Sequence, residues 1–161
     1  LHLIDINQTD ARIRTVANFL SRYDPERILV VSARQYGQRP ARKFAQSIGA
    51  KRIVGRFIPG TLTNPKLRTY TEPEVLVVTD PAADSQALSE AVSTGLPIVG
   101  IVDANNTLRN VDLALPANNK GRRSLALIYW LLAREMLTSR GATNYADWER
   151  AQDVEEWEST F

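Results

Sequence analysis

Short, nearly continuous runs of apolar and mostly β-branched residues recur along this chain, and they constrain its fold more than any other feature. A strand with one face in water alternates apolar and polar residues, whereas a strand covered on both faces is apolar throughout. The runs therefore predict strands of a mostly parallel sheet with helices on both faces. They lie at 3–6, 28–31, 53–54, 75–78, 98–102 and 113–115.

Helical periodicity separates several of these runs. Apolar residues spaced i, i+3, i+4 and i+7 predict helices over 13–20 and 41–48, and a shorter pattern predicts one over 87–91. Gly49 and Gly95 follow the second and third of these, as glycine often follows a helix. Strands and helices in alternation predict an α/β domain with three layers, α/β/α.

A fourth helix is predicted over 124–137, where apolar residues occur on every side, so we expect it to be deeply buried. A length of 161 residues is typical of one domain, with room for an appendage. Because the composition changes after Gly141, we expect an α/β domain over 1–141 and an acidic, aromatic tail over 142–161.

The tail carries six acidic residues and one basic residue together with scattered aromatic rings. A single helix would place the first two rings opposite the last two, so we expect the tail to dock in separate pieces. Apolar groups of this kind usually mark a contact, either with the chain's own basic surface or with a basic neighbouring protein, which we prefer. If the tail docks on a neighbouring protein, we expect a chain truncated after Gly141 to remain folded. The candidate protein contacts are Tyr145, Trp148, Trp157 and Phe161.

Charge is distributed unevenly along the chain. The net charge is only +2, yet residues 11–70 hold 13 Lys and Arg against two acids, and 120–140 carry a net +4. Sixteen of the twenty basic residues are arginine, whose planar fork matches phosphate oxygens and stacks on bases. The pattern indicates a nucleic-acid partner, and the alternative is a bipolar, solvated surface.

One predicted connection, 55–74, is too long for a plain turn and has no helical periodicity. Loops of this length inside compact domains are usually functional or disordered. It has cations interleaved with aromatic rings and no acid before Glu72, which suits phosphate contact and base stacking. The alternative is a solvated excursion whose apolar residues cover the sheet. The residues concerned are Arg56, Phe57, Ile58, Lys66, Arg68 and Tyr70.

Two further basic elements adjoin predicted strands or helices. Arg34 and Arg39 follow the second strand, so they project from one edge of the sheet. Lys120, Arg122 and Arg123 precede the helix at 124–137, where free backbone N–H groups also attract phosphate. The neighbouring asparagines and glycine could equally form only a turn and a cap.

Enzyme motifs are poorly represented. The chain has no cysteine and a single histidine, His2, which excludes most thiol and metal chemistry, and we expect no cofactor. A glycine spacing at 55–60 imitates a phosphate-binding loop, but Thr61 replaces the essential lysine. Asp80 and Asp103 each follow a strand, where a base or a sugar ligand could sit, yet both also suit turns. No apolar run is long enough to cross a membrane.

Several motifs are recognisable together. They are Ser-Ala-Arg-Gln-Tyr-Gly at 32–37, Gly-Arg-Phe-Ile-Pro-Gly-Thr-Leu-Thr-Asn at 55–64, Val-Val-Thr-Asp-Pro at 77–81, Asn-Asn-Lys-Gly at 118–121 and Tyr-Trp-Leu-Leu-Ala-Arg-Glu at 129–135. In this order they closely resemble the archaeal and eukaryotic form of small-subunit ribosomal protein S two, the laminin-receptor-precursor family. The resemblance covers roughly residues 1–141.

The resemblance implies a flavodoxin-like fold and a structural role in the small subunit of the cytoplasmic ribosome, with ribosomal RNA and neighbouring ribosomal proteins as partners. It implies no reaction and no small-molecule substrate. Arg56, Asn64 and Lys120 fall inside the shared motifs. Family members normally have a further segment before the equivalent of Leu1, and the tail repeats of animal members are absent here. Two alternatives compete: a phosphosugar- or nucleotide-binding α/β enzyme domain, and a protein-interaction module acting through the tail.

Overall fold

Five parallel strands form one sheet in the computed structural model, which describes residues 6–159. The order across the sheet is β2-β1-β3-β4-β5, and every neighbouring pair is parallel. This is the strand order of flavodoxin-like folds, so the predicted fold class is confirmed. The strands are β1 (Ile28–Ser32), β2 (Lys51–Val54), β3 (Val75–Val78), β4 (Ile98–Val102) and β5 (Leu113–Pro116).

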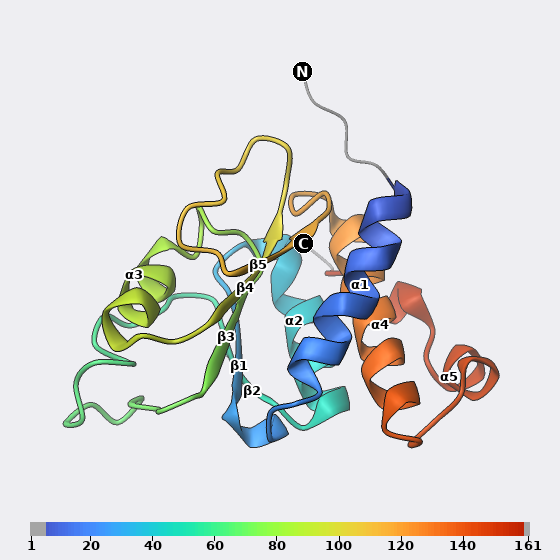
Figure 1. The fold of residues 1–161 in the computed structure, drawn as a ribbon, viewed down its shortest axis with the longest axis horizontal. Coiled ribbons are helices and arrows are strands. Elements are labelled where there is room, and N and C mark those ends of the chain that lie inside the picture. The colour runs from blue at the N-terminus through green and yellow to red at the C-terminus, as the bar shows by residue number, and fades with distance from the viewer. Residues whose placement is uncertain (1–5, 160–161) are drawn as a thin grey trace.

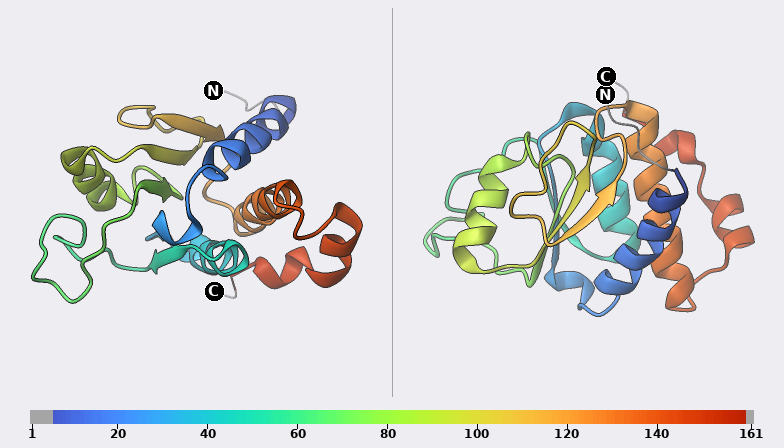
Figure 2. Two further views of the ribbon diagram at one scale, coloured as in Figure 1. Left: turned by 60° about the horizontal axis from the view of Figure 1, so that its bottom comes forward. Right: turned by 45° about the horizontal axis from the view of Figure 1, so that its top comes forward.

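Helices and one long loop cover the two faces of the sheet (Figures 1 and 2). Helices α1, α2 and α4 lie on one side, and α3 lies on the other together with the 55–74 loop. The tail forms a short helix, α5, and a turn of 3-10 helix, η2, outside α4. The helices are α1 (Ile6–Leu20), η1 (Pro25–Arg27), α2 (Gln35–Ile48), α3 (Ser85–Thr94), α4 (Arg122–Ser139), α5 (Tyr145–Ala151) and η2 (Val154–Trp157).

The central strands supply both halves of the core. In β1, Ile28 and Val30 pack into the cluster beneath α1, α2 and α4, whereas Leu29 and Val31 pack into the cluster beneath α3. Successive side chains of a strand point to opposite faces, so a strand apolar at every position is buried on both. The continuous apolar runs are explained by this two-sided burial.

The predicted strand at 3–6 differs from the structure at its end. Residues 3–5 lie outside the described residues, and at Ile6 a helix begins rather than a strand. Ile6 is seven positions before Ile13, so in sequence it continues the apolar stripe of α1. A short apolar run at the start of a helix gives the same local signal as a short strand.

Helix α4 is mostly buried, as expected, but it has one exposed strip. Leu127 is 45% exposed, because it lies over a shallow apolar groove between α1 and α4 instead of beneath a neighbouring element. The expectation of burial on every side is therefore wrong at this position. No helix within residues 6–159 has the length and apolarity that a membrane crossing requires.

The tail docks in two pieces, and its aromatic rings turn inward. Trp148 and Trp157 are buried in the main core cluster, with ring centroids 5.9 Å apart, and Trp148 lies 5.9 Å from Trp130 of α4. The two tail indoles therefore offer almost no surface to another protein, and the fold-back alternative describes them. Tyr145 is 41% exposed, and Phe161 lies outside the described residues.

We expect Trp157→Ala to lower the free energy of unfolding by about 3–5 kcal/mol, the usual cost of deleting a buried large aromatic side chain. The measurement is urea unfolding followed by tryptophan fluorescence and circular dichroism. Glu155→Ala in the same turn is the matched control, because that side chain is exposed.

Truncation after Gly141 should likewise lower the free energy of unfolding of the domain, because it removes both buried indoles of the tail. A truncated chain of normal stability would contradict the burial of Trp148 and Trp157.

Candidate nucleic-acid interface

The carboxyl edge of the sheet contains the crevice where such folds usually bind ligands, between β1 and β3. Here an ion pair with one buried partner joins the ends of these two strands. Arg34 follows β1, and its Nε lies 2.6 Å from Oδ2 of Asp80, which follows β3 and has a fully buried side chain. Arg34 therefore neutralises an internal carboxylate. An RNA phosphate would have to compete with Asp80 for the Arg34 guanidinium group.

A second carboxylate, Asp84, joins the ends of the same two strands. Its Oδ1 accepts a hydrogen bond from the Ala33 N–H at 2.7 Å, and its Oδ2 accepts from the N–H groups of Thr79 and Asp80 at 3.0 Å each. Burial raises the pKa of Asp84 to about 6, although these donors favour the charged form. The sequence showed Asp84 only as the residue before a helix, so this bridging role was missed.

Asp103 is not brought into contact with Asp80 but is linked to it through asparagine side chains. Asn106 donates to Asp80 Oδ1 at 3.3 Å and accepts from the Asp103 N–H at 2.9 Å, while Asn119 donates to Asn106 Oδ1 at 2.7 Å. Asp80 also accepts from the N–H of Ala82, as a turn-forming aspartate does. Asp80 and Asp103, which the sequence left open between a ligand site and turns, therefore serve turns and an internal network.

The predicted RNA-binding cations fall into two classes. Some have intramolecular partners. Arg34 pairs with Asp80, Arg39 donates a hydrogen bond to the Glu156 carbonyl, and the largely exposed Arg123 lies 4.0 Å from Glu158. Others are exposed and have no ion pair to any residue in the described part of the chain; these are Arg56, Lys66, Arg68, Lys120 and Arg122. Asn64 is exposed, and its Oδ1 accepts from the Lys66 N–H to form a turn.

These free cations do not form one compact patch. Arg56 follows β2 and Arg122 begins α4, so both lie at the carboxyl edge of the sheet. The loop then leaves that edge and returns to the amino edge before β3 (Figure 1). In sequence, Lys66 and Arg68 belong to this returning part of the loop. An RNA partner would therefore have to extend around the β2 side of the molecule.

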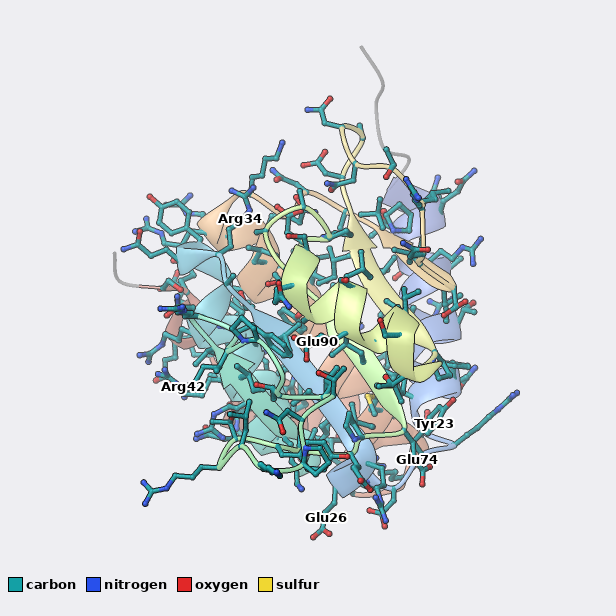
Figure 3. All side chains as sticks on the ribbon, turned by 90° about the vertical axis from the view of Figure 1, so that its left-hand side faces the viewer. Tyr23, Glu26, Arg34, Arg42, Glu74 and Glu90 are labelled. Atoms are coloured by element: carbon teal, nitrogen blue, oxygen red, sulfur yellow. The ribbon has the colours of Figure 1, made fainter. Side chains whose placement is uncertain are left out.

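Three cations that were not assigned to the site lie on that side. Arg42 is on α2, and Lys51 and Arg52 are on the edge strand β2; all three are exposed and unpaired within residues 6–159. Figure 3 shows Arg42 on the same flank as Arg34. The signal that could have found them is the stretch 27–71, which has ten basic residues and no acid.

The long loop is held in place by Glu90 of α3, which lies between that helix and the loop (Figure 3). The Glu90 carboxylate accepts hydrogen bonds from the N–H groups of Gly60 at 2.9 Å and Leu62 at 3.0 Å, and from Gln86 at 2.8 Å. Burial alone would raise the pKa of Glu90, but these donors outweigh it and the pKa is lowered. No pattern in the sequence indicates this anchor.

Among the described residues, no group of three or more histidine and acidic side chains is placed to hold a metal ion. Tyr129, which is fully buried, instead shares its hydroxyl with Thr79 at 2.7 Å, and burial raises the pKa of this phenol. The interior polar groups thus serve the fold, and the accessible chemistry of the surface is that of free cations.

Comparison with known proteins places the chain beside one sequence family and one of its characterised relatives. The sequence model of a family described as ribosomal protein S2 matches residues 66–139. A small ribosomal subunit protein uS2 from Haloquadratum walsbyi is 56% identical over 142 residues, which are 88% of this chain and 51% of that protein. The chain therefore spans about half the length of this relative.

We expect Asp84→Asn to lower the free energy of unfolding by about 1–3 kcal/mol at neutral pH, because an amide cannot accept from all three N–H groups. In the unchanged protein the raised pKa means that the folded state holds this proton more tightly. Its contribution to stability is then complete below about pH 4 and is lost as the pH rises through about 6. Urea unfolding across this range should show that decline, and the Asn variant should lack it.

Asp103→Asn is the control for this experiment, because the Asp103 side chain is half-buried and, within residues 6–159, accepts only from its neighbour Ala104. Its free energy of unfolding should change by no more than about 0.5 kcal/mol. Equal pH profiles for the Asp84→Asn variant and the unchanged protein would contradict the assignment.

We expect Glu90→Ala to release the loop without unfolding the sheet, since it leaves the N–H groups of Gly60 and Leu62 without their acceptor. Amide hydrogen exchange at these two positions should become faster, whereas exchange within β1 and β3 stays slow. Gln86→Ala is the matched control, because it removes one donor to Glu90 and leaves both loop hydrogen bonds. Unchanged exchange in the Glu90 variant would show that the loop is held by its apolar contacts alone.

Proposed function

Because the chain belongs to the ribosomal protein S2 family, we propose that it is a structural constituent of the small subunit of the cytoplasmic ribosome, where it binds ribosomal RNA and neighbouring ribosomal proteins. The observation that carries the proposal is the high identity with a small-subunit protein over most of this chain. The role is architectural and involves no reaction and no cofactor.

The surface charge supports an RNA partner. Phosphate contacts contribute affinity by releasing counterions, and this requires cations that are not already neutralised by the protein. Exposed, unpaired cations occur on α2, β2, the 55–74 loop and the start of α4. Arginine and lysine on separate elements suit an RNA backbone that bends around the molecule better than they suit one small anion.

The alternative of a phosphosugar- or nucleotide-binding enzyme has less support. Where such a ligand would bind, Asp80 is already paired with Arg34, and Asp84 already accepts three backbone N–H groups. We infer that this crevice is chemically idle. A nucleotide or sugar phosphate held there by Asp80 and Asp103 in a soaked crystal would overturn this part of the proposal.

A protein neighbour is proposed for the outer side of the tail. Tyr145 stays a candidate contact, since its ring is partly exposed and packs 4.0 Å from the Arg134 guanidinium carbon. The exposed acids of α5 and η2 suit a basic protein. Trp148 and Trp157 contribute indirectly, by holding these elements on α4.

The test compares three charge variants of equal size in binding small-subunit RNA and a generic RNA of equal length. One changes Arg56, Lys66 and Arg68 to glutamine, and a second changes Lys120, Arg122 and Arg123. Each should weaken binding and reduce the slope of log affinity against log salt by roughly 0.9 for each duplex phosphate that the variant no longer binds.

The third variant is the control, in which three exposed arginines outside these elements, Arg12, Arg22 and Arg109, become glutamine. It should retain most of the affinity and the slope. Incorporation of the unchanged chain into small subunits is measured in parallel. Absence of incorporation, together with no preference for small-subunit RNA, would refute the proposed function.

A further inference from the structure

The outer side of strand β2 is an open sheet edge. Within residues 6–159, β2 pairs only with β1, and the hydrogen bond from Gly55 N–H to the Ser32 carbonyl, 2.8 Å long, sets the phase of that pairing. In a parallel strand, alternate residues direct both backbone groups to the same side. Because Gly55 faces β1, the N–H and C=O groups of Arg52 and Val54 face outward, and no other described segment pairs with them.

The 55–74 loop returns along this edge and turns it into a groove. The groove has a volume of about 720 Å³, and its two walls are β2 and the segment 69–71. Thr69, Tyr70 and Thr71 form the loop wall, and the Thr69 hydroxyl lies 3.3 Å from that of Thr61. The fold thus places one aromatic ring and several neutral hydrogen-bonding groups across from an unpaired strand edge.

Cations line the β2 side of the groove. Arg42, Lys51 and Arg52 all contribute to it, and none has an ion pair with another residue of the described chain. The acid next in sequence, Glu72, accepts a hydrogen bond of 2.6 Å from the Tyr70 hydroxyl. The β2 wall therefore carries positive charge that no ion pair within residues 6–159 neutralises, and this favours an anionic, extended occupant.

We propose that this groove binds an unpaired strand of ribosomal RNA, with its phosphates on Arg42, Lys51 and Arg52 and a base stacked against Tyr70. The free backbone groups of Arg52 and Val54 then hydrogen-bond base edges or ribose hydroxyls. Unpaired RNA can present separate bases to an aromatic side chain, whereas a duplex keeps its bases stacked inside. This inference rests on the proposed function and assigns it a specific site.

An acidic peptide added to the edge of β2 is the other extended occupant to consider. The charge pattern favours RNA, because the free cations continue past the edge to Arg56, Lys66 and Arg68. One added strand covers only the four residues of β2, whereas a sugar-phosphate backbone can follow the whole track.

The test uses two groove variants of the full chain and a single-stranded RNA oligonucleotide, with the matching duplex as a second probe. The triple change of Arg42, Lys51 and Arg52 to glutamine should reduce the salt slope by about 2, at roughly 0.7 for each single-strand phosphate bound. Tyr70→Leu should weaken single-strand binding roughly 5- to 150-fold, as expected when one base stack is removed, with the salt slope unchanged. Neither variant should affect duplex binding as strongly.

The Arg12, Arg22 and Arg109 triple variant again controls for net charge. A second readout uses a photoreactive amino acid at Thr69 in assembled small subunits, where we expect a crosslink to RNA. A crosslink to a protein, or groove variants that behave like the control, would overturn the inference while leaving the proposed function intact. A chain that neither binds small-subunit RNA nor enters subunits would instead refute the function itself.

Discussion

A parallel sheet is apolar on both faces, and each face must be covered before the chain is stable in water. Among residues 6–159, helices α1, α2 and α4 cover one face, but the other has only α3 and the 55–74 loop. Phe57 and Leu62 of the loop are buried against the sheet, so the loop replaces a helix as a structural layer. Glu90 completes this layer by binding the loop backbone. The same segment can therefore present free cations on a fixed surface.

Internal neutralisation decides which cations remain available to a partner. Arg34 and Arg42 belong to the same basic stretch, yet Arg34 meets the buried carboxylate of Asp80, whereas Arg42 forms no ion pair within residues 6–159. Removing Asp80 alone would leave one unpaired charge near the crevice, so the pair is a fixed part of the fold. The surface beside β2 is basic because the stretch that builds it, residues 27–71, contains no acid at all.

Local sequence patterns were sufficient to predict most strands and helices. The spacing of apolar residues along the chain reflects which side of each element is buried, and this spacing can be read from one sequence. The patterns failed where the deciding partner is distant in sequence. Trp148 and Trp157 lie in an acidic segment whose composition suggests a contact with another protein. The surface that buries them is made by α4 and α2, which are distant in sequence. At Gly37 the deciding partner is instead close in sequence. A Cβ there would lie 2.5 Å from Ser32 Oγ, so the glycine of the motif at 32–37 lets α2 approach the sheet.

The inward docking of the tail also affects how the protein forms during its own synthesis. Ser159 donates to the carbonyls of Gln35 and Tyr36, and Trp157 fills the core beside the helix that those two residues begin. These contacts span more than 120 positions of the chain. The ribosome makes α2 long before it makes residue 157, so the nascent domain remains incompletely packed until its tail has emerged from the exit tunnel.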